Sequence, residues 1–278
     1  MKINIDGKIF NADRAKISVL DHAFLFGDSV YEVLRTRGGA LENYEEHFER
    51  LRASARFIHL ELLHDAAFYR GEIEKTCRAL AAPEAAIRWI VTRGVGDLSL
   101  SPMGCVPSFV IIAKTLDLAV IPPFVKLVMV RQITSDQLSV DPRIKTGNRL
   151  AHVLAMHEVK VAGGYEALLK NREGELAEGL TSSFFFIRKN CLHTPSLQTG
   201  ILNGVMRRRV LAAARKLGIQ SEEGKYHEET LEQADAVFIC SSTRGIVPVD
   251  AIDNLAFKSR SHQIVVSLDQ QIEKVAVY

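Results

Sequence analysis

The first third of the chain mixes two spacings of hydrophobic residues, period two and period 3.6. Apolar and polar residues alternate on both sides of Asp6-Gly7, a turn dipeptide, which predicts an opening hairpin. Carboxylates gather at the beginning of one helical pattern, where they suit the positive end of a helix dipole. The predicted elements are a hairpin at 3–9, helices at 44–57 and 65–81, and strands at 87–92 and 108–114. The long Gly- and Pro-containing segment 94–107 is expected to be a loop, and loops on a rigid scaffold often carry binding groups.

The consecutive prolines at 122 and 123 interrupt this pattern, because neither a helix nor a strand ladder continues through two prolines. We therefore expect an N-terminal domain at 1–116, a linker at 117–123 and a C-terminal domain at 124–278. A chain of 278 residues is long enough for two such domains.

The second region reads as short strands followed by helices. The predicted elements are a strand at 125–132, a helix at 148–162, a β-meander through 167–169, 175–177, 183–188 and 191–193, helices at 205–217 and 229–234, and a buried strand at 236–240. Gly218 suits the position just after a helix end. The last strand runs into the polar turn 241–245, whose amides and hydroxyls could surround an anion.

Composition narrows the class of protein. Apolar residues make up 47% and charged residues 24%, which is ordinary for a globular protein, and a net charge of +2 without a basic block argues against nucleic acid as a partner. The chain begins without the apolar core of a signal peptide and contains no membrane-length apolar run, so we expect a cytoplasmic protein. The four cysteines form no C-x-x-C pair, and we expect no metal site.

Two basic side chains are candidates for binding and catalysis. His47, Arg50 and Ser54 lie at i, i+3 and i+7, on one side of a predicted helix, and an arginine there can grip phosphate oxygens in a fork. Lys145 lies between a predicted strand and a helix, where desolvation could turn a lysine into a carbonyl nucleophile. Alone, Arg50 also fits a solvated helix face and Lys145 an ordinary exposed lysine.

Two later segments could also contribute to a site. Glu178 comes at the end of a predicted strand, beside Gly179 and several hydroxyls, although this pattern also fits a solvent turn. Residues 201–207 lead into a predicted helix, whose first amides can bind an anion or can simply begin the helix.

Together and in this order, these segments closely resemble the class IV aminotransferase family, over nearly the whole chain. The motifs that carry the resemblance are FGDSVYE at 26–32, EH-x-x-RL at 46–51, a lysine followed by N-x-L at 145–150, EG at 178–179, L-x-GV-x-R at 202–207, AD at 234–235 and VPV at 247–249. The resemblance implies an α/β (α+β) protein with the two-domain fold type IV architecture of pyridoxal 5'-phosphate enzymes. In that architecture a small N-terminal α/β domain precedes a larger C-terminal, cofactor-binding domain with a β-barrel-like core.

The resemblance also implies roles for individual residues. Lys145 is the implied catalytic lysine, which binds the cofactor covalently and shuttles a proton, Arg50 an implied phosphate ligand, and Glu178 the implied partner of the pyridine nitrogen. The other implied cofactor-binding residues are Thr181, Leu202, Val205, Met206, Ser242 and Thr243. The candidates for binding the substrate carboxylate are Tyr31, Arg88 and Arg244. Arg88 also fits a structural arginine at a strand edge, and Arg244 a solvated loop residue. Family members generally work as homodimers.

The residues that distinguish the members of this family from one another do not all point to the same member. The loop at 93–102 resembles branched-chain aminotransferases and lacks the Arg-x-His signature of D-amino-acid aminotransferases, whereas Arg149 and Met206 lean toward 4-amino-4-deoxychorismate lyases. Against the lyase, Glu32 and Val33 stand where lyases tend to carry paired threonines. We expect an aminotransferase that moves an amino group between an aliphatic amino acid, branched-chain or D, and a 2-oxo acid such as 2-oxoglutarate. The alternatives are the lyase and, more remotely, a non-catalytic protein that binds pyridoxal phosphate.

Overall fold

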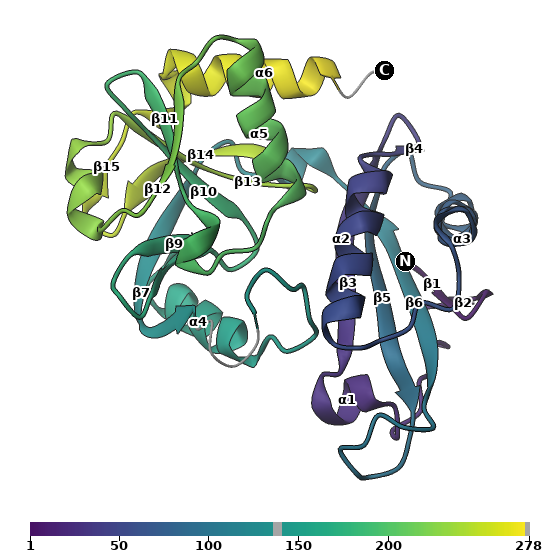
Figure 1. Ribbon diagram of the computed structural model, residues 1–278. Coiled ribbons are helices and arrows are strands. Elements are labelled where there is room, and N and C mark those ends of the chain that lie inside the picture. Colours follow the sequence, from purple (N-terminus) through teal and green to yellow (C-terminus); the bar gives the residue numbers. More distant parts are fainter. Residues whose placement is uncertain (136–140, 276–278) are drawn as a thin grey trace. The chain divides into compact units, whose positions relative to one another are not determined.

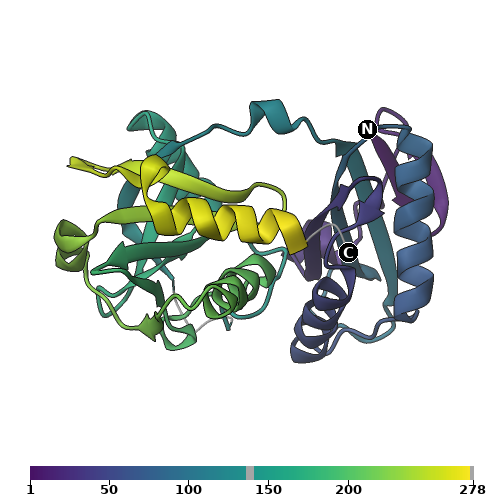
Figure 2. The ribbon, with the colours of Figure 1, turned by 90° about the horizontal axis from the view of Figure 1, so that it is seen from above.

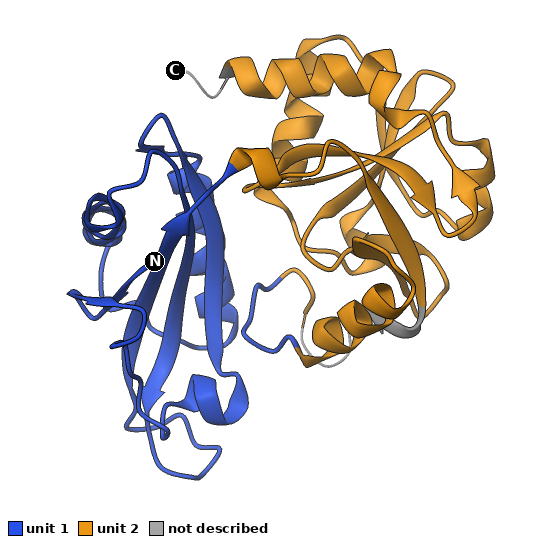
Figure 3. Cartoon of the chain, turned by 180° about the vertical axis from the view of Figure 1, so that it is seen from behind, with its two compact units in different colours: residues 1–117, 144–149 blue, residues 118–143, 150–278 orange. Residues whose placement is uncertain are grey.

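A computed structural model describes residues 1–135 and 141–275, and the chain forms two compact units (Figure 3). The first comprises Met1–Asp117 and Ile144–Arg149, and the second Leu118–Arg143 and Leu150–Tyr278. Lys145 was expected in the C-terminal domain at 124–278, yet Ile144–Arg149 is grouped with the first unit. The reason is backbone pairing: Tyr31 N donates to Lys145 O, and Gly147 N donates to Ser29 O. The expected limits of the two domains otherwise stay a prediction.

The first unit is built on a six-stranded sheet with the strand order β2-β1-β6-β5-β3-β4. Its strands are β1 (Lys2–Ile5), β2 (Lys8–Asn11), β3 (Ser29–Arg37), β4 (Ala40–Leu41), β5 (Ala85–Val95) and β6 (Val106–Thr115), and its helices are α1 (His22–Phe26), α2 (Tyr44–Phe57) and α3 (Ala66–Leu80) (Figure 1). Helices α2 and α3 share one apolar core with β3, β5 and β6. At its centre, the fully buried Trp89 stacks against Tyr44 and Phe48, which fixes α2 on the sheet.

Most sequence predictions for this unit are confirmed. The hairpin at Asp6-Gly7 is β1–β2, with Ile5 paired to Lys8. The helix predicted at 44–57 is α2, and the helix predicted at 65–81 is α3, capped by the Asp65 side chain. Local periodicity sufficed for these elements, because each buries one apolar face.

The second unit contains a nine-stranded mixed sheet with the order β12-β11-β10-β13-β14-β7-β8-β9, and β15 pairs with β14. Its strands are β7 (Val125–Ser135), β8 (Glu166–Asn171), β9 (Leu176–Gly179), β10 (Ser183–Arg188), β11 (Cys191–Pro195), β12 (Ser221–Gly224), β13 (Ala236–Ser241), β14 (Gly245–Ile252) and β15 (Leu255–Ala256). The sheet curls strongly, so that β9 also approaches β10 and β11, which gives this unit its barrel-like core (Figures 1 and 2).

Helices cover this curled sheet. They are α4 (Leu150–Val161), α5 (Val205–Lys216) and α6 (Gln263–Val275), and the 3-10 turns are Leu118–Val120, Leu197–Thr199, Glu228–Gln233 and Ser259–Ser261. Helices α5 and α6 share an apolar core with β10, β11 and β13. The predicted Gly218 follows the end of α5 with φ of 69°, a conformation that glycine adopts without strain.

Two expectations for this unit were wrong. The meander predicted over 167–193 is interrupted, because β10 pairs with β13 rather than with β9. The helix predicted at 229–234 is a 3-10 helix at Glu228–Gln233. No helix within the described residues is long and apolar enough to cross a membrane.

Candidate functional site

Lys145 is the centre of a cluster in the first unit. Its backbone is held on two sides, since its carbonyl accepts from Tyr31 N and its N–H donates to Ser54 Oγ, 3.2 Å away. Its Nζ lies 4.8 Å from the centre of the Tyr31 ring. Burial lowers the pKa of Lys145, and the nearby charges of Arg50 and Arg149 act in the same direction, against Tyr31 and Glu32. The neutral amine is therefore easier to reach than in an exposed lysine.

Arg50 is held by a buried carboxylate rather than lying on a solvated helix face. Its Nε donates to Glu32 Oε1 at 2.7 Å, and its second terminal nitrogen donates to Glu32 Oε2 at 2.6 Å. His47 Nδ1 lies 2.7 Å from the same carboxylate, and both His47 and Glu32 are fully buried. Burial would raise the pKa of Glu32, but Arg50 and His47 outweigh it and lower this pKa to about 2. Glu32 is thus ionised and orients Arg50.

Tyr31 connects these groups to Arg88. The Arg88 guanidinium lies over the Tyr31 ring, 4.0 Å from its centre, and Arg88 is exposed on β5. Burial would raise the pKa of Tyr31, but the positive charges of Lys145, Arg149 and Arg88 lower it overall. A phenol among several cations can donate to, or lie beside, a bound carboxylate.

In the second unit, Glu178 and the beginning of α5 lie close together. Glu178 Oε1 accepts from Leu202 N at 3.2 Å, just before α5 begins. Val205 and Met206, the first residues of α5, are buried, and the N-cap residue Gly204 supplies no capping side chain. The first amides of an uncapped helix favour an anion such as a phosphate.

The turn after β13 lies at the same end of the sheet. A Cβ built at Gly204 would come 2.7 Å from Ser183 Oγ, so α5 begins in close contact with β10 and a larger residue here would force Ser183 to move. Ser183 pairs with Cys240 on β13, and β13 leads directly into Ser242 and Thr243. The register therefore brings these hydroxyls to the end of β10 where α5 begins.

Arg244 is tightly engaged within the second unit. It donates to Glu166 Oε2 at 2.8 Å, to Ser241 Oγ at 2.9 Å and to Thr181 Oγ1 at 2.8 Å. The other oxygen of Glu166 accepts from Thr181 N and Ser182 Oγ, and the Glu166 side chain is only 2% exposed. Arg244 is therefore a partly buried structural partner of the buried Glu166 rather than a solvated loop residue.

Glu166 was not among the residues singled out from the sequence, and the role of Glu32 as the partner of Arg50 was not foreseen. Both carboxylates lie on strands, and nothing in the local pattern shows which arginine each one meets. The helix spacing of His47, Arg50 and Ser54 was the available signal, since all three contact this cluster.

Known proteins match the chain over nearly its whole length. The family model described as amino-transferase class IV matches residues 29–252. The chain is 34% identical to the "Putative branched-chain-amino-acid aminotransferase" of Methanocaldococcus jannaschii, over 94% of this chain and 91% of that protein. It is 29% identical to the D-alanine aminotransferase of Bacillus licheniformis (91% and 89% covered) and 25% identical to the aminodeoxychorismate lyase of Bacillus subtilis (98% and 94% covered).

The fold agrees with these sequence matches. The branched-chain aminotransferase from Thermoproteus uzoniensis, solved with norvaline, superposes with a TM-score of 0.92 at 26% identity, over 99% of this chain and 94% of that one. The chain has the two-domain α/β architecture of fold type IV enzymes, and it belongs to the class IV aminotransferase family. It is a transaminase-class enzyme whose cofactor is pyridoxal 5'-phosphate, and an amino acid and an oxo acid are the substrate classes that fit this family.

The residues present fit this cofactor. Lys145 Nζ has no hydrogen bond or ion pair to any residue that the structure describes, and burial lowers its pKa, as a lysine that reacts with an aldehyde requires. The uncapped beginning of α5 suits a phosphate.

Proposed function

We propose that this enzyme transfers an amino group between an aliphatic amino acid, branched-chain or D, and a 2-oxo acid, with 2-oxoglutarate as one partner. Glu32 is the residue that favours amino-group transfer over elimination. It is buried, ionised and bonded to both Arg50 and His47, in the place where related lyases tend to carry threonine hydroxyls. Neither Glu32 nor Val33 offers a hydroxyl to a departing group.

Lys145 is the proposed catalytic base and acid. When bound, pyridoxal phosphate supplies an electron sink for the carbanion that forms as the substrate Cα loses its proton. The lowered pKa of Lys145 favours the neutral amine, which removes the Cα proton and later returns a proton to the cofactor side. Ser54 and Tyr31 hold the Lys145 backbone, and so limit where this amine can point.

Other side chains are proposed to hold the cofactor. Glu178 pairs with the pyridine nitrogen and keeps it protonated, and Arg50, oriented by Glu32, binds the phosphate. The remaining proposed cofactor contacts are Thr181, Leu202, Val205, Met206, Ser242 and Thr243. Met206 can contribute only its backbone amide to phosphate binding, because its side chain has no donor.

The substrate carboxylate is proposed to meet Tyr31 and Arg88. Arg88 is exposed, and its guanidinium lies over the Tyr31 ring, so its donors remain accessible. Arg244 is the weaker candidate, because reaching a substrate would break its bonds to Glu166 and Thr181.

The lyase remains the second candidate, and Arg149 favours it. This arginine stands where branched-chain aminotransferases usually have a tyrosine, and its charge acts on both Lys145 and Tyr31.

A half-reaction screen separates the two functions. L- and D-amino acids are added one at a time to the holoenzyme while the cofactor spectrum is recorded. Aliphatic amino acids should convert the cofactor to its amine form, and 2-oxoglutarate should reverse the change. Release of pyruvate and 4-aminobenzoate from aminodeoxychorismate, with no response to any amino acid, would replace this proposal with the lyase.

We further propose a cytoplasmic homodimer with domains at 1–116 and 124–278. Four apolar residues on α4 support self-association, because all are more than half exposed on the single chain. They are Leu150, Val153, Leu154 and Val161. The free cysteines fit a reducing compartment.

A further inference from the structure

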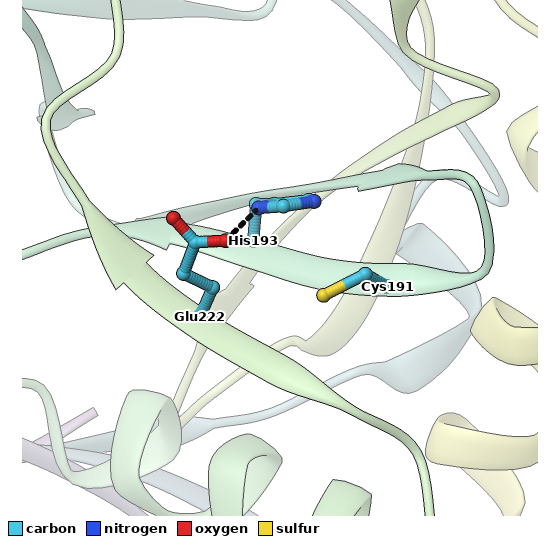
Figure 4. Close-up of side chains that lie close together, drawn as sticks. All are labelled: Cys191, His193 and Glu222. Carbon is cyan, nitrogen blue, oxygen red and sulfur yellow. Dashed lines mark ion pairs between the residues drawn. The ribbon is translucent and has the colours of Figure 1, made fainter.

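Three potential metal ligands meet on the two strands at one edge of the second unit's sheet. Cys191 and His193 lie two residues apart on β11, so their side chains share one face of the strand. The neighbouring strand β12 runs parallel to β11 and places Glu222 directly opposite His193. Figure 4 shows the three side chains converging, and their ligand atoms all lie within 4.8 Å of one another.

His193 is held rigidly in this group. Its side chain is 4% exposed, and its ring stacks on Phe186 with 4.9 Å between centroids and meets Tyr226 edge-on. These two ring contacts fix the plane of the imidazole. The side chain is therefore positioned before any ligand arrives.

We propose that Cys191, His193 and Glu222 form a binding site for Zn²⁺ that is separate from the cofactor-binding residues. A thiolate, an imidazole and a carboxylate are all ligands that Zn²⁺ accepts. Metal–ligand distances of about 2.0–2.3 Å in a tetrahedron place ligand atoms roughly 3.3–3.6 Å apart. His193 Nδ1 and Glu222 Oε2 are already 3.7 Å apart, and Cys191 Sγ lies within 4.8 Å of a ligand atom of each. Water supplies the fourth ligand.

Tyr226 does not block this site. Its hydroxyl lies 3.2 Å from His193 Nδ1, but it is also 3.3 Å from the carbonyl oxygen of Glu222, to which it can donate instead. Binding therefore frees Nδ1 without leaving the buried hydroxyl unsatisfied. The Cys191 thiol proton leaves to solvent as the thiolate coordinates the metal, and no redox change is involved.

The expected consequence is a more stable sheet edge. Strand β12 is the last strand of the sheet and pairs only with β11 among the described strands. A metal bound by both strands links them through their side chains, and a ligand that binds only the folded state raises the stability of that state.

The test uses holoenzyme treated with a chelator and titrated with Co²⁺, then with Zn²⁺. Cobalt should give tetrahedral d–d bands in the red, where the cofactor does not absorb, and a thiolate-to-metal charge-transfer band. Zinc should bleach these bands at one equivalent per chain and raise Tm. Cys191→Ser should abolish the charge-transfer band. Glu222→Gln should weaken zinc binding by at least roughly 10–100-fold, which is the cost of losing a residue that only hydrogen-bonds to a metal ligand.

Cys105→Ser is the matched control, because Cys105 Sγ lies 3.8 Å from His22 Nε2 and is the other partly exposed thiol beside a histidine. This variant should titrate like the parent protein, and so should Tyr226→Phe, which only removes a competing hydrogen bond. Bands that survive in Cys191→Ser but vanish in Cys105→Ser would overturn the proposal, as would the absence of tetrahedral bands in the parent. None of these readouts depends on transaminase activity.

Discussion

Glu32 binds Arg50 through both carboxylate oxygens, at 2.7 and 2.6 Å, and the carboxylate is completely buried. If Arg50 binds the cofactor phosphate as proposed, this pairing fixes its orientation before the cofactor arrives, which reduces the side-chain entropy lost on binding. His47, one helical turn before Arg50, contacts the same carboxylate.

Glu32→Gln should lower both stability and cofactor affinity. Removing one partner of a buried ion pair costs about 3–5 kcal/mol of unfolding free energy, because the other charge stays buried. Urea unfolding and titration with pyridoxal phosphate measure the two effects. Glu49→Gln, at an exposed position on α2 next to Arg50, is the control and should change neither.

Stability should also fall in acid because of Glu32. Its pKa of about 2 lies below its ordinary value of 4.5, so its contribution is fully present above about pH 4.5 and is lost as the pH falls toward 2. The difference in unfolding free energy between the parent and Glu32→Gln should shrink over this window. A difference that stays constant down to pH 2 would show that the ionised carboxylate is not the stabilising species.

Lys145→Ala should lower kcat by at least roughly 100–10,000-fold, the range for loss of a general acid–base group. Borohydride reduction of the parent holoenzyme followed by peptide mapping should place the cofactor mass on the peptide that contains Lys145. Lys160→Arg, at an exposed position on α4, is the control and should keep full activity. A label on Lys160 or Lys170 instead would contradict the assignment.

Glu178→Gln should retain the cofactor but lower kcat by about 10²–10³-fold, because the electron sink weakens without a full negative charge. Single-turnover kinetics with an aliphatic amino acid measure the effect. Glu173→Gln, exposed in the turn before β9, should behave like the parent. Unchanged turnover in Glu178→Gln would mean that another residue faces the ring nitrogen.

Arg244→Ala should lower the unfolding free energy by about 3–5 kcal/mol, because it leaves the Glu166 carboxylate buried without its cation. The double variant Arg244→Ala with Glu166→Gln should recover part of this loss, as a coupled pair requires. If Arg244 also binds a second carboxylate of the substrate, Arg244→Ala will raise KM for glutamate and spare a monocarboxylic donor. If Arg244→Ala leaves KM for glutamate unchanged, or changes KM for both donors equally, the role of Arg244 is structural and not in substrate binding.

Leu154→Glu on α4 should shift the protein from dimer to monomer, because a charge would be buried in the proposed contact between two chains. Light scattering after size-exclusion chromatography measures the mass. Lys160→Glu, also exposed on α4, changes charge without touching an apolar residue and should leave the mass unchanged. A parent protein that is already monomeric would contradict the homodimer.

The sequence alone determined the elements that depend on local periodicity. The α-helical repeat places His47, Arg50 and Ser54 on one side of α2 wherever that helix packs, and the structure confirms that all three reach the cluster around Lys145. The tertiary structure alone decided which partners these side chains meet. Glu32 lies on β3, and the order of the sheet, not the local pattern, brings it to Arg50. The pairing of β10 with β13 and the bond from Arg244 to Glu166 on β8 were decided in the same way. Both join segments that are distant in the sequence, and such contacts form only when the whole curled sheet is assembled.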